Sequence, residues 1–303
     1  MERKNRINIG YLYALAAGIS SGLVPVIFQK ALGQSTLPRI TGLFIKLVAS
    51  SLVLLPLALP KIKQLRPDRK LYGKIGVCSL LYIATLIFLY ESYEYIPTGI
   101  SISLHYTFPF FTMLFSAVLF HFRCTKQSVA AMLLSLIGVA LLSSGSVSDG
   151  GAPLGIVLAL SSAVTYAGCF LWIEHKKLTE LNTTVSVTLR TCGAALLSLP
   201  YVLLSDGLTC SMSFRTFFGV VLSGLFTVLA SFFLTIAIRH IGSVHTSILG
   251  SIEPIVCAVG GVLVLGETVG LRSGIGIIMV LVATVLVTLS NQKAKNSRGG
   301  GSK

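Results

Sequence analysis

Charged residues are scarce in this 303-residue chain: they make up 11% of it, and only 10 are Asp or Glu. An ordinary soluble domain has about 25% charged residues, so the composition excludes a typical water-soluble fold. Hydrophobic residues make up 53% of the chain, and apolar runs of transmembrane length recur from end to end. The sequence therefore predicts an all-α integral membrane protein embedded in a lipid bilayer.

Motifs of catalysis and of cofactor binding are also missing from the sequence. It contains no H-E-x-x-H run, no P-loop and no dinucleotide fingerprint, and its six scattered cysteines form no C-x-x-C pair and are interpreted as packing residues. The net charge of +14 lies mostly in short loops between apolar runs, which is typical of membrane topology rather than of nucleic-acid binding. We expect no catalytic residue, cofactor, metal or nucleic-acid partner. A membrane-embedded enzyme or sensor is a remote alternative.

Ten apolar segments joined by short loops are long enough to cross a bilayer. The predicted helices are 7–28, 39–59, 71–93, 98–120, 126–145, 152–173, 183–204, 215–237, 243–265 and 271–290. Cytoplasmic loops are enriched in Lys and Arg. With the N-terminus inside, the only such residues in outside segments are Lys30, Arg39, Arg215 and Arg272. Both termini are therefore expected in the cytoplasm, with residues 291–303 as a flexible tail or, in part, an added linker.

The second half of the chain repeats the first at an offset of 145 residues. Gly10 then falls in register with Gly155, and Pro109 with Pro254. Each half holds five predicted helices, and an odd number reverses the orientation of the second half in the membrane. We therefore predict two inverted five-helix repeats. The predicted units are 7–145 and 152–290.

This layout resembles the EamA type of the drug/metabolite transporter (DMT) superfamily, over essentially all of residues 7–290. The resemblance rests on the two repeats and on three motifs, which are His105-Tyr-Thr-Phe-Pro109, Glu253-Pro254 and Gly266-Glu267. It implies a ten-helix carrier whose central cavity, lined mainly by helices 1, 3, 4, 6, 8 and 9, opens alternately to either side. The fourth helix has Phe108 where the ninth has Glu253, so the carboxylate is not duplicated.

Prolines interrupt the fourth and ninth predicted helices. A proline frees the carbonyl group four residues before it and kinks the helix, so Pro109 and Pro254 are predicted hinges. Polar and aromatic side chains beside these kinks and on the third and sixth helices are predicted to line the cavity. Packing is the alternative for each aromatic residue. The candidate cavity residues are Tyr82, His105, Tyr106, Tyr166, Phe170, Trp172, Ser251 and Glu253.

Glu253 is predicted to lie near the bilayer centre, where a carboxylate is costly unless it is paired, hydrated or protonated. One interpretation makes it a substrate-binding or protonation group, and the other makes it a partner for polar groups at the kink. Histidine can titrate near neutral pH, but His105 can equally be a neutral group hydrogen-bonded between helices. Coupling of transport to protons or to sodium is left open.

Lys46 and Arg190 are the cations inside predicted helices, at nearly equivalent positions of the two repeats. Intramembrane charges usually face a cavity and mark a solute path or a gate, whereas long basic side chains can also snorkel to the interface. By depth alone, Glu91 is the candidate partner of Lys46, and Glu174 is the candidate partner of Arg190. These four residues are the predicted gating or charge-pairing groups.

The function predicted from these features is secondary active transport of a small metabolite by alternating access. Two cations suit a carboxylate, and Glu253 with aromatic rings suits an amine, so an amino acid or related amphipathic solute is the leading class, with export favoured. The alternative is uptake of choline or another cationic amine in an aromatic cage. The expected setting is a bacterial plasma membrane, with the protein a monomer or homodimer.

Overall fold

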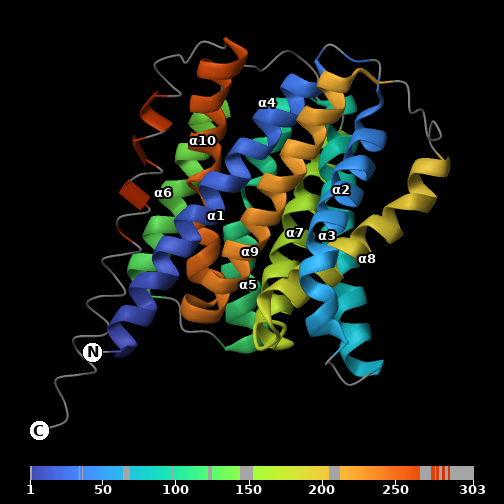
Figure 1. The fold of residues 1–303 in the computed structure, drawn as a ribbon. Helices are drawn as coiled ribbons and strands as arrows, with labels where there is room; N and C mark the ends of the chain where they lie inside the picture. The colour runs from blue at the N-terminus through green and yellow to red at the C-terminus, as the bar shows by residue number, and fades with distance from the viewer. Residues whose placement is uncertain are drawn as a thin grey trace, which may run out of the picture.

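The computed structural model describes residues 2–33, 35, 37–63, 69–96, 98–121, 125–143, 153–204, 212–266, 274–276, 278–279, 282–283 and 286. Within these residues the fold is all-α, and six helical stretches are long and apolar enough to cross a membrane. The helices run side by side in one bundle, with α8 tilted at its margin (Figure 1). The predicted tail at 291–303 lies outside the described residues, as does most of the predicted helix at 271–290.

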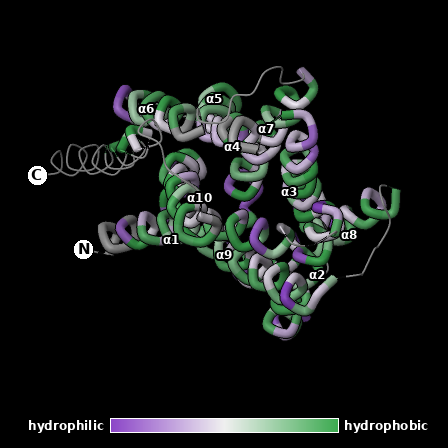
Figure 2. The backbone as a smooth tube through the Cα atoms, turned by 90° about the horizontal axis from the view of Figure 1, so that it is seen from above, coloured by the Kyte–Doolittle hydropathy of each residue, from purple (hydrophilic) through white to green (hydrophobic). Residues whose placement is uncertain are grey.

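The first half of the chain forms α1 (Glu2–Leu32), α2 (Arg39–Ile62), α3 (Arg69–Tyr95), α4 (Thr98–His105), α5 (Phe108–Phe120) and α6 (Lys126–Ser143). The second half forms α7 (Pro153–His175), α8 (Thr183–Leu204), α9 (Phe214–Gly250), α10 (Glu253–Gly260) and the π-helical turn η1 (Gly261–Leu265). Seen from above, the helices stand around a common centre, with α6 and α8 at opposite edges (Figure 2).

Two predicted helices are broken in the structure. The fourth, expected as one helix, is divided into α4 and α5, and the ninth is divided between the end of α9 and α10. Pro109 and Pro254 each occupy the first turn of the new helix, where a missing N–H breaks no helical hydrogen bond. Each proline is therefore the second residue of a helix that begins after a two-residue interruption, at 106–107 and at 251–252.

The predicted connection between the eighth and ninth helices is only one residue long in the structure. α9 comprises two helical segments that meet at Gly242, where the chain leaves the helical region at φ 80° and ψ 166°. Glycine adopts this backbone conformation without steric cost, whereas residues with a Cβ do so rarely. A single glycine therefore replaces the expected connection.

Equivalent features recur at the 145-residue offset. Left-handed residues end both broken helices, with His121 at φ 52° after α5 and Gly266 at φ 74° after η1. Close helix contacts recur as well: a Cβ on Gly10 would lie 2.7 Å from the side chain of Ile241, and one on Gly155 would lie 2.9 Å from that of Ile96. The first helix of each half thus packs against the other half, α1 on α9 and α7 on α3.

Large apolar side chains are exposed on the outside of the bundle. An aqueous surface of this kind is an aggregation hazard, whereas lipid tails solvate it without cost. The most exposed examples are Leu12, Leu52, Leu57, Val118, Leu119, Leu196, Leu204, Phe214, Leu263 and Ile278. The structure is that of an all-helical membrane protein.

Replacement of Gly242 by alanine is expected to lower the melting temperature of the detergent-purified protein. The left-handed backbone would cost a residue with a Cβ about 1–3 kcal/mol, and the added Cβ would lie 3.0 Å from Oε1 of Glu174. The matched control is Gly76→Ala in α3, where a Cβ meets no atom within 4 Å and alanine favours the helix. Equal melting temperatures for the two variants would contradict the kink.

Candidate functional site

A cavity lies at the centre of the bundle, beside the two helix breaks. Its volume is about 150 Å³, comparable with an engineered protein cavity that holds benzene, so it is sized for a small solute. Helices α1, α3, α4, α5, α7, α9 and α10 line it, and α2 and α8 each contribute a cation. The predicted cavity residues that reach it are Tyr82, His105, Tyr106, Tyr166, Phe170 and Glu253.

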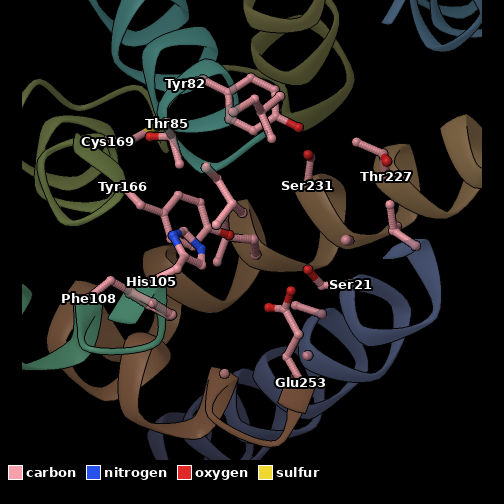
Figure 3. Close-up of a pocket in the computed structure, with 18 of the residues that line it drawn as sticks. Ser21, Tyr82, Thr85, His105, Phe108, Tyr166, Cys169, Thr227, Ser231 and Glu253 are labelled. Atoms are coloured by element: carbon pink, nitrogen blue, oxygen red, sulfur yellow. The ribbon is translucent and has the colours of Figure 1, made fainter. Parts of the chain in front are cut away.

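Glu253 is the first residue of α10 and lies at the cavity wall. Figure 3 shows its carboxylate turned toward Ser21 across the gap between α10 and α1, and Tyr106 lines the same cavity. A carboxylate is also favoured at a helix N-terminus. The break in the chain therefore places Glu253 where it can stabilise α10 and face a solute at the same time.

Aromatic rings from α4, α5 and α7 form one wall of the cavity (Figure 3). The Tyr166 ring lies 5.3 Å from His105, 4.8 Å from Phe108 and 4.9 Å from Phe170, between centroids. His105 also forms a 3.0 Å hydrogen bond with Ser162 through Nδ1. His105 therefore lines the cavity and forms a hydrogen bond between helices, and its titration stays a prediction.

Lys46 is 2% exposed and places its ammonium group over two aromatic rings, 5.2 Å from the centroid of Phe28 and 5.9 Å from that of Tyr90. The predicted pairing with Glu91 is wrong. The Glu91 carboxylate instead accepts a 2.5 Å hydrogen bond from the Tyr201 hydroxyl. Successive residues of a helix point about 100° apart, so Tyr90 turns toward Lys46 while Glu91 turns toward α8.

Arg190 is buried and is held by neutral oxygen atoms. Its Nε donates to the carbonyl of Ser186 at 3.1 Å, and Nη2 donates to Oγ1 of Thr235 at 2.7 Å. The predicted pairing with Glu174 is wrong, because that carboxylate accepts the backbone N–H of Ser243 at 2.8 Å. This N–H follows the kink in α9 and begins a new helical segment, where a carboxylate is a favourable partner.

Two predicted cavity residues are not among those that line the cavity. Trp172 donates from Nε1 to the carbonyl of Lys74 at 2.8 Å, because two residues beyond Phe170 the α7 surface has turned by about 200°. Ser251 is buried within the break between α9 and α10. Both positions follow from helix rotation and packing, which depth along the sequence does not specify.

The cavity also has lining residues that our sequence analysis missed. Most carry small hydroxyl groups, which are common in membrane helices and hence distinguish no site. Helical spacing is the one available signal, since residues four apart share a face. The missed polar residues are Ser21, Thr85, Tyr90, Tyr93, Thr191, Thr227, Ser231 and Thr246.

A bundle of membrane-length helices around a central, partly charged cavity is the architecture of a membrane transporter. The profile of the EamA-like transporter family matches residues 8–144 and again residues 153–289. The chain belongs to the EamA-like transporter family, within the DMT superfamily.

Relatives and a solved structure agree with this assignment. An uncharacterized transporter of Synechocystis is 26% identical over 231 residues, 74% of this chain and 68% of the relative. The uncharacterized inner membrane transporter YedA of Escherichia coli is 24% identical over 265 residues, 86% and 85% of the two chains. An uncharacterized transporter of Clostridium kluyveri is 21% identical over 95% of each chain. One crystal structure shares the fold with a TM-score of 0.80 at 17% identity, over 94% of this chain and 98% of that chain.

Lys46→Met is expected to increase the free energy of unfolding by about 1 kcal/mol and so to raise the melting temperature of the purified protein. The substitution removes a buried charge that has no carboxylate within ion-pair distance among the described residues. The control is Arg39→Met, which breaks an exposed 2.8 Å ion pair with Glu94 and is expected to change stability little. A lower melting temperature for Lys46→Met would show that the ammonium group has a stabilising partner. Thermal unfolding in detergent measures both variants.

Proposed function

We propose that this transporter moves a small carboxylate-bearing amphipathic metabolite, with amino acids as the leading class. The observation that carries the proposal is the charge of the cavity wall, where Lys46 and Arg190 stand with a single described carboxylate, Glu253. Among the described residues neither cation has an ion-pair partner. A buried charge is costly without a counter-charge, so a solute carboxylate is the favourable partner.

The rest of the cavity suits the other parts of such a solute. Glu253 with the hydroxyl of Ser21 can accept an ammonium group, and the rings around Tyr166 can contact an apolar side chain. The cavity volume of about 150 Å³ limits the solute to a small metabolite. Together these features support an amphipathic solute that carries charges of both signs.

The transport mechanism that we propose is alternating access by two inverted five-helix units, 7–145 and 152–290, which together span the membrane ten times. The odd number of predicted helices per unit and the recurrence of both helix breaks at one offset support inversion. Pro109 and Pro254 are the proposed hinges. The distribution of Lys and Arg supports a cytoplasmic location for both termini. We also propose that the protein lies in the plasma membrane and that it exports its solute.

A cationic amine such as choline is the second candidate, because Phe108, Tyr166 and Phe170 gather at the cavity beside Glu253. Rings can bind such a cation through cation–π contacts. The positive charges of Lys46 and Arg190 line the same cavity and repel a cationic solute, so we rank this candidate below a carboxylate. Transport measurements on charge variants separate the two candidates.

Lys46→Met and Arg190→Met are each expected to reduce the transport of carboxylate-bearing solutes into liposomes by about tenfold or more, since a hydrogen bond to a charged group contributes about 1.5–3 kcal/mol. Transport of cationic amines should be unchanged or increased. Lys30→Met is the matched control, because Lys30 is exposed and bonds to the carbonyl of Val264 outside the cavity.

The measurement uses purified protein reconstituted into liposomes. The radiolabelled solutes to be tested are amino acids, carboxylates without an amine, and quaternary amines. Loss of carboxylate transport in both cavity variants, with the control intact, is the expected result. Undiminished carboxylate transport in both variants would overturn the proposed role of the cavity cations. Transport of amines alone would favour the second candidate.

A further inference from the structure

Two cysteines from different halves of the chain face each other beside the cavity. The Sγ atoms of Cys78 in α3 and Cys169 in α7 lie 3.6 Å apart, and both side chains are buried. Cys169 also lines the cavity, where Figure 3 shows it next to Thr85 and across from Glu253. The two thiols therefore form a pair that a species in the cavity can reach through Cys169.

A cation stands next to this thiol pair. The backbone carbonyl of Arg190 accepts a 3.0 Å hydrogen bond from the hydroxyl of Ser79, the residue after Cys78, and Arg190 lines the same cavity as Cys169. A neighbouring cation stabilises a thiolate, and the thiolate is the form that binds metals and reacts with oxidants. The site therefore combines two sulfur ligands with one fixed positive charge.

We propose that Cys78 and Cys169 form a two-sulfur binding site for a soft monovalent cation, with Cu(I) or Ag(I) as the chemical class. Thiolate ligands select such cations over hard ones. Among the described residues no group of three or more His, Cys, Asp or Glu side chains could hold a metal, and Zn(II) requires four ligands. Two sulfurs match a cation that accepts two-coordinate binding.

Charge balance favours this ligand over the other chemistry of a thiol pair. When Cu(I) binds, each thiol releases one proton to water in the cavity, two metal–sulfur bonds form, and no electron is transferred. The product carries one negative charge, which the Arg190 guanidinium neutralises. A disulfide would be uncharged and would leave Arg190 next to a poor acceptor, so the presence of the arginine supports the metal site.

The geometry requires only a small adjustment. Metal–sulfur bonds as long as Zn–S bonds, about 2.3 Å each, would separate the sulfurs by about 4.6 Å when collinear, so the present spacing of 3.6 Å must widen by about 1 Å. Rotation of two side chains provides that change. Cys169 is next to Phe170 on α7 and borders open cavity space, which leaves it room to turn.

The test uses the full-length, reduced, detergent-purified protein under anaerobic conditions, with Cu(I) as the probe. A competing chelator removes Cu(I) that is bound by one thiol alone. The expected result is one Cu(I) per chain with two sulfur ligands by X-ray absorption. Cys78→Ser and Cys169→Ser should each abolish this binding, whereas Cys192→Ser and Cys257→Ser, which alter cysteines on α8 and α10, should retain it.

Arg190→Met provides a second readout that a merely structural thiol pair would not give. Loss of a partner outside the coordination shell typically weakens metal binding by 10- to 100-fold, and a decrease of about that size is expected. Unchanged Cu(I) binding in the Cys78→Ser/Cys169→Ser double variant would overturn the site.

If a serine variant fails to fold, the wild-type protein supplies the measurement. Bound Cu(I) should protect Cys169 from alkylation by N-ethylmaleimide, as mapped by mass spectrometry, and equal alkylation with and without Cu(I) would overturn the proposal. We further expect Cu(I) to inhibit carboxylate transport, an expectation that rests on the proposed function. The charge of the Arg190 guanidinium group would then neutralise the metal-bound thiolates and would not be available to the solute. Binding of Cu(I) without inhibition would leave the site intact and count against Arg190 as the carboxylate contact.

Discussion

Backbone N–H and C=O groups have no water to bond with inside a bilayer, so a spanning helix can be interrupted only where protein or a polar cavity satisfies the freed groups. The interruptions of this bundle obey that constraint. The breaks before Pro109 and Pro254 border the cavity, and after the kink at Gly242 the Glu174 carboxylate accepts the backbone N–H of Ser243. The cavity lies beside the two breaks because a break in the helical surface leaves space there for solute and polar side chains.

The same constraint explains how the cavity tolerates its charges. Lys46 lies over two aromatic rings, and Arg190 is held by a carbonyl and a hydroxyl. These neutral partners orient the cations but leave their charge uncompensated. Evolution commonly accepts reduced stability at a functional site, and a fixed unpaired cation is then available to a solute or, for Arg190, to a metal-bound thiolate pair.

Agreement between sequence and structure is best where a residue acts on its own backbone. Pro109 and Pro254 mark helix starts because a missing N–H and a fixed φ act locally, and both breaks occur at the predicted offset. Agreement fails where the face of a helix decides the outcome. Glu91 is one residue away from Tyr90, and Trp172 is two residues beyond Phe170, yet helix rotation turns both side chains to a different neighbour.

Composition, hydropathy and the spacing of prolines by themselves determined that this chain is a helical membrane protein with a repeat at 145 residues, since these properties depend on local chemistry and on the absence of water. Only the tertiary structure decided which side chains meet. Cys78 and Cys169 are 91 positions apart and come into contact because α3 packs on α7. Glu174 belongs to a kink rather than to Arg190 for the same reason: helix rotation and close packing, set jointly by all neighbours, fix distances that no single segment encodes.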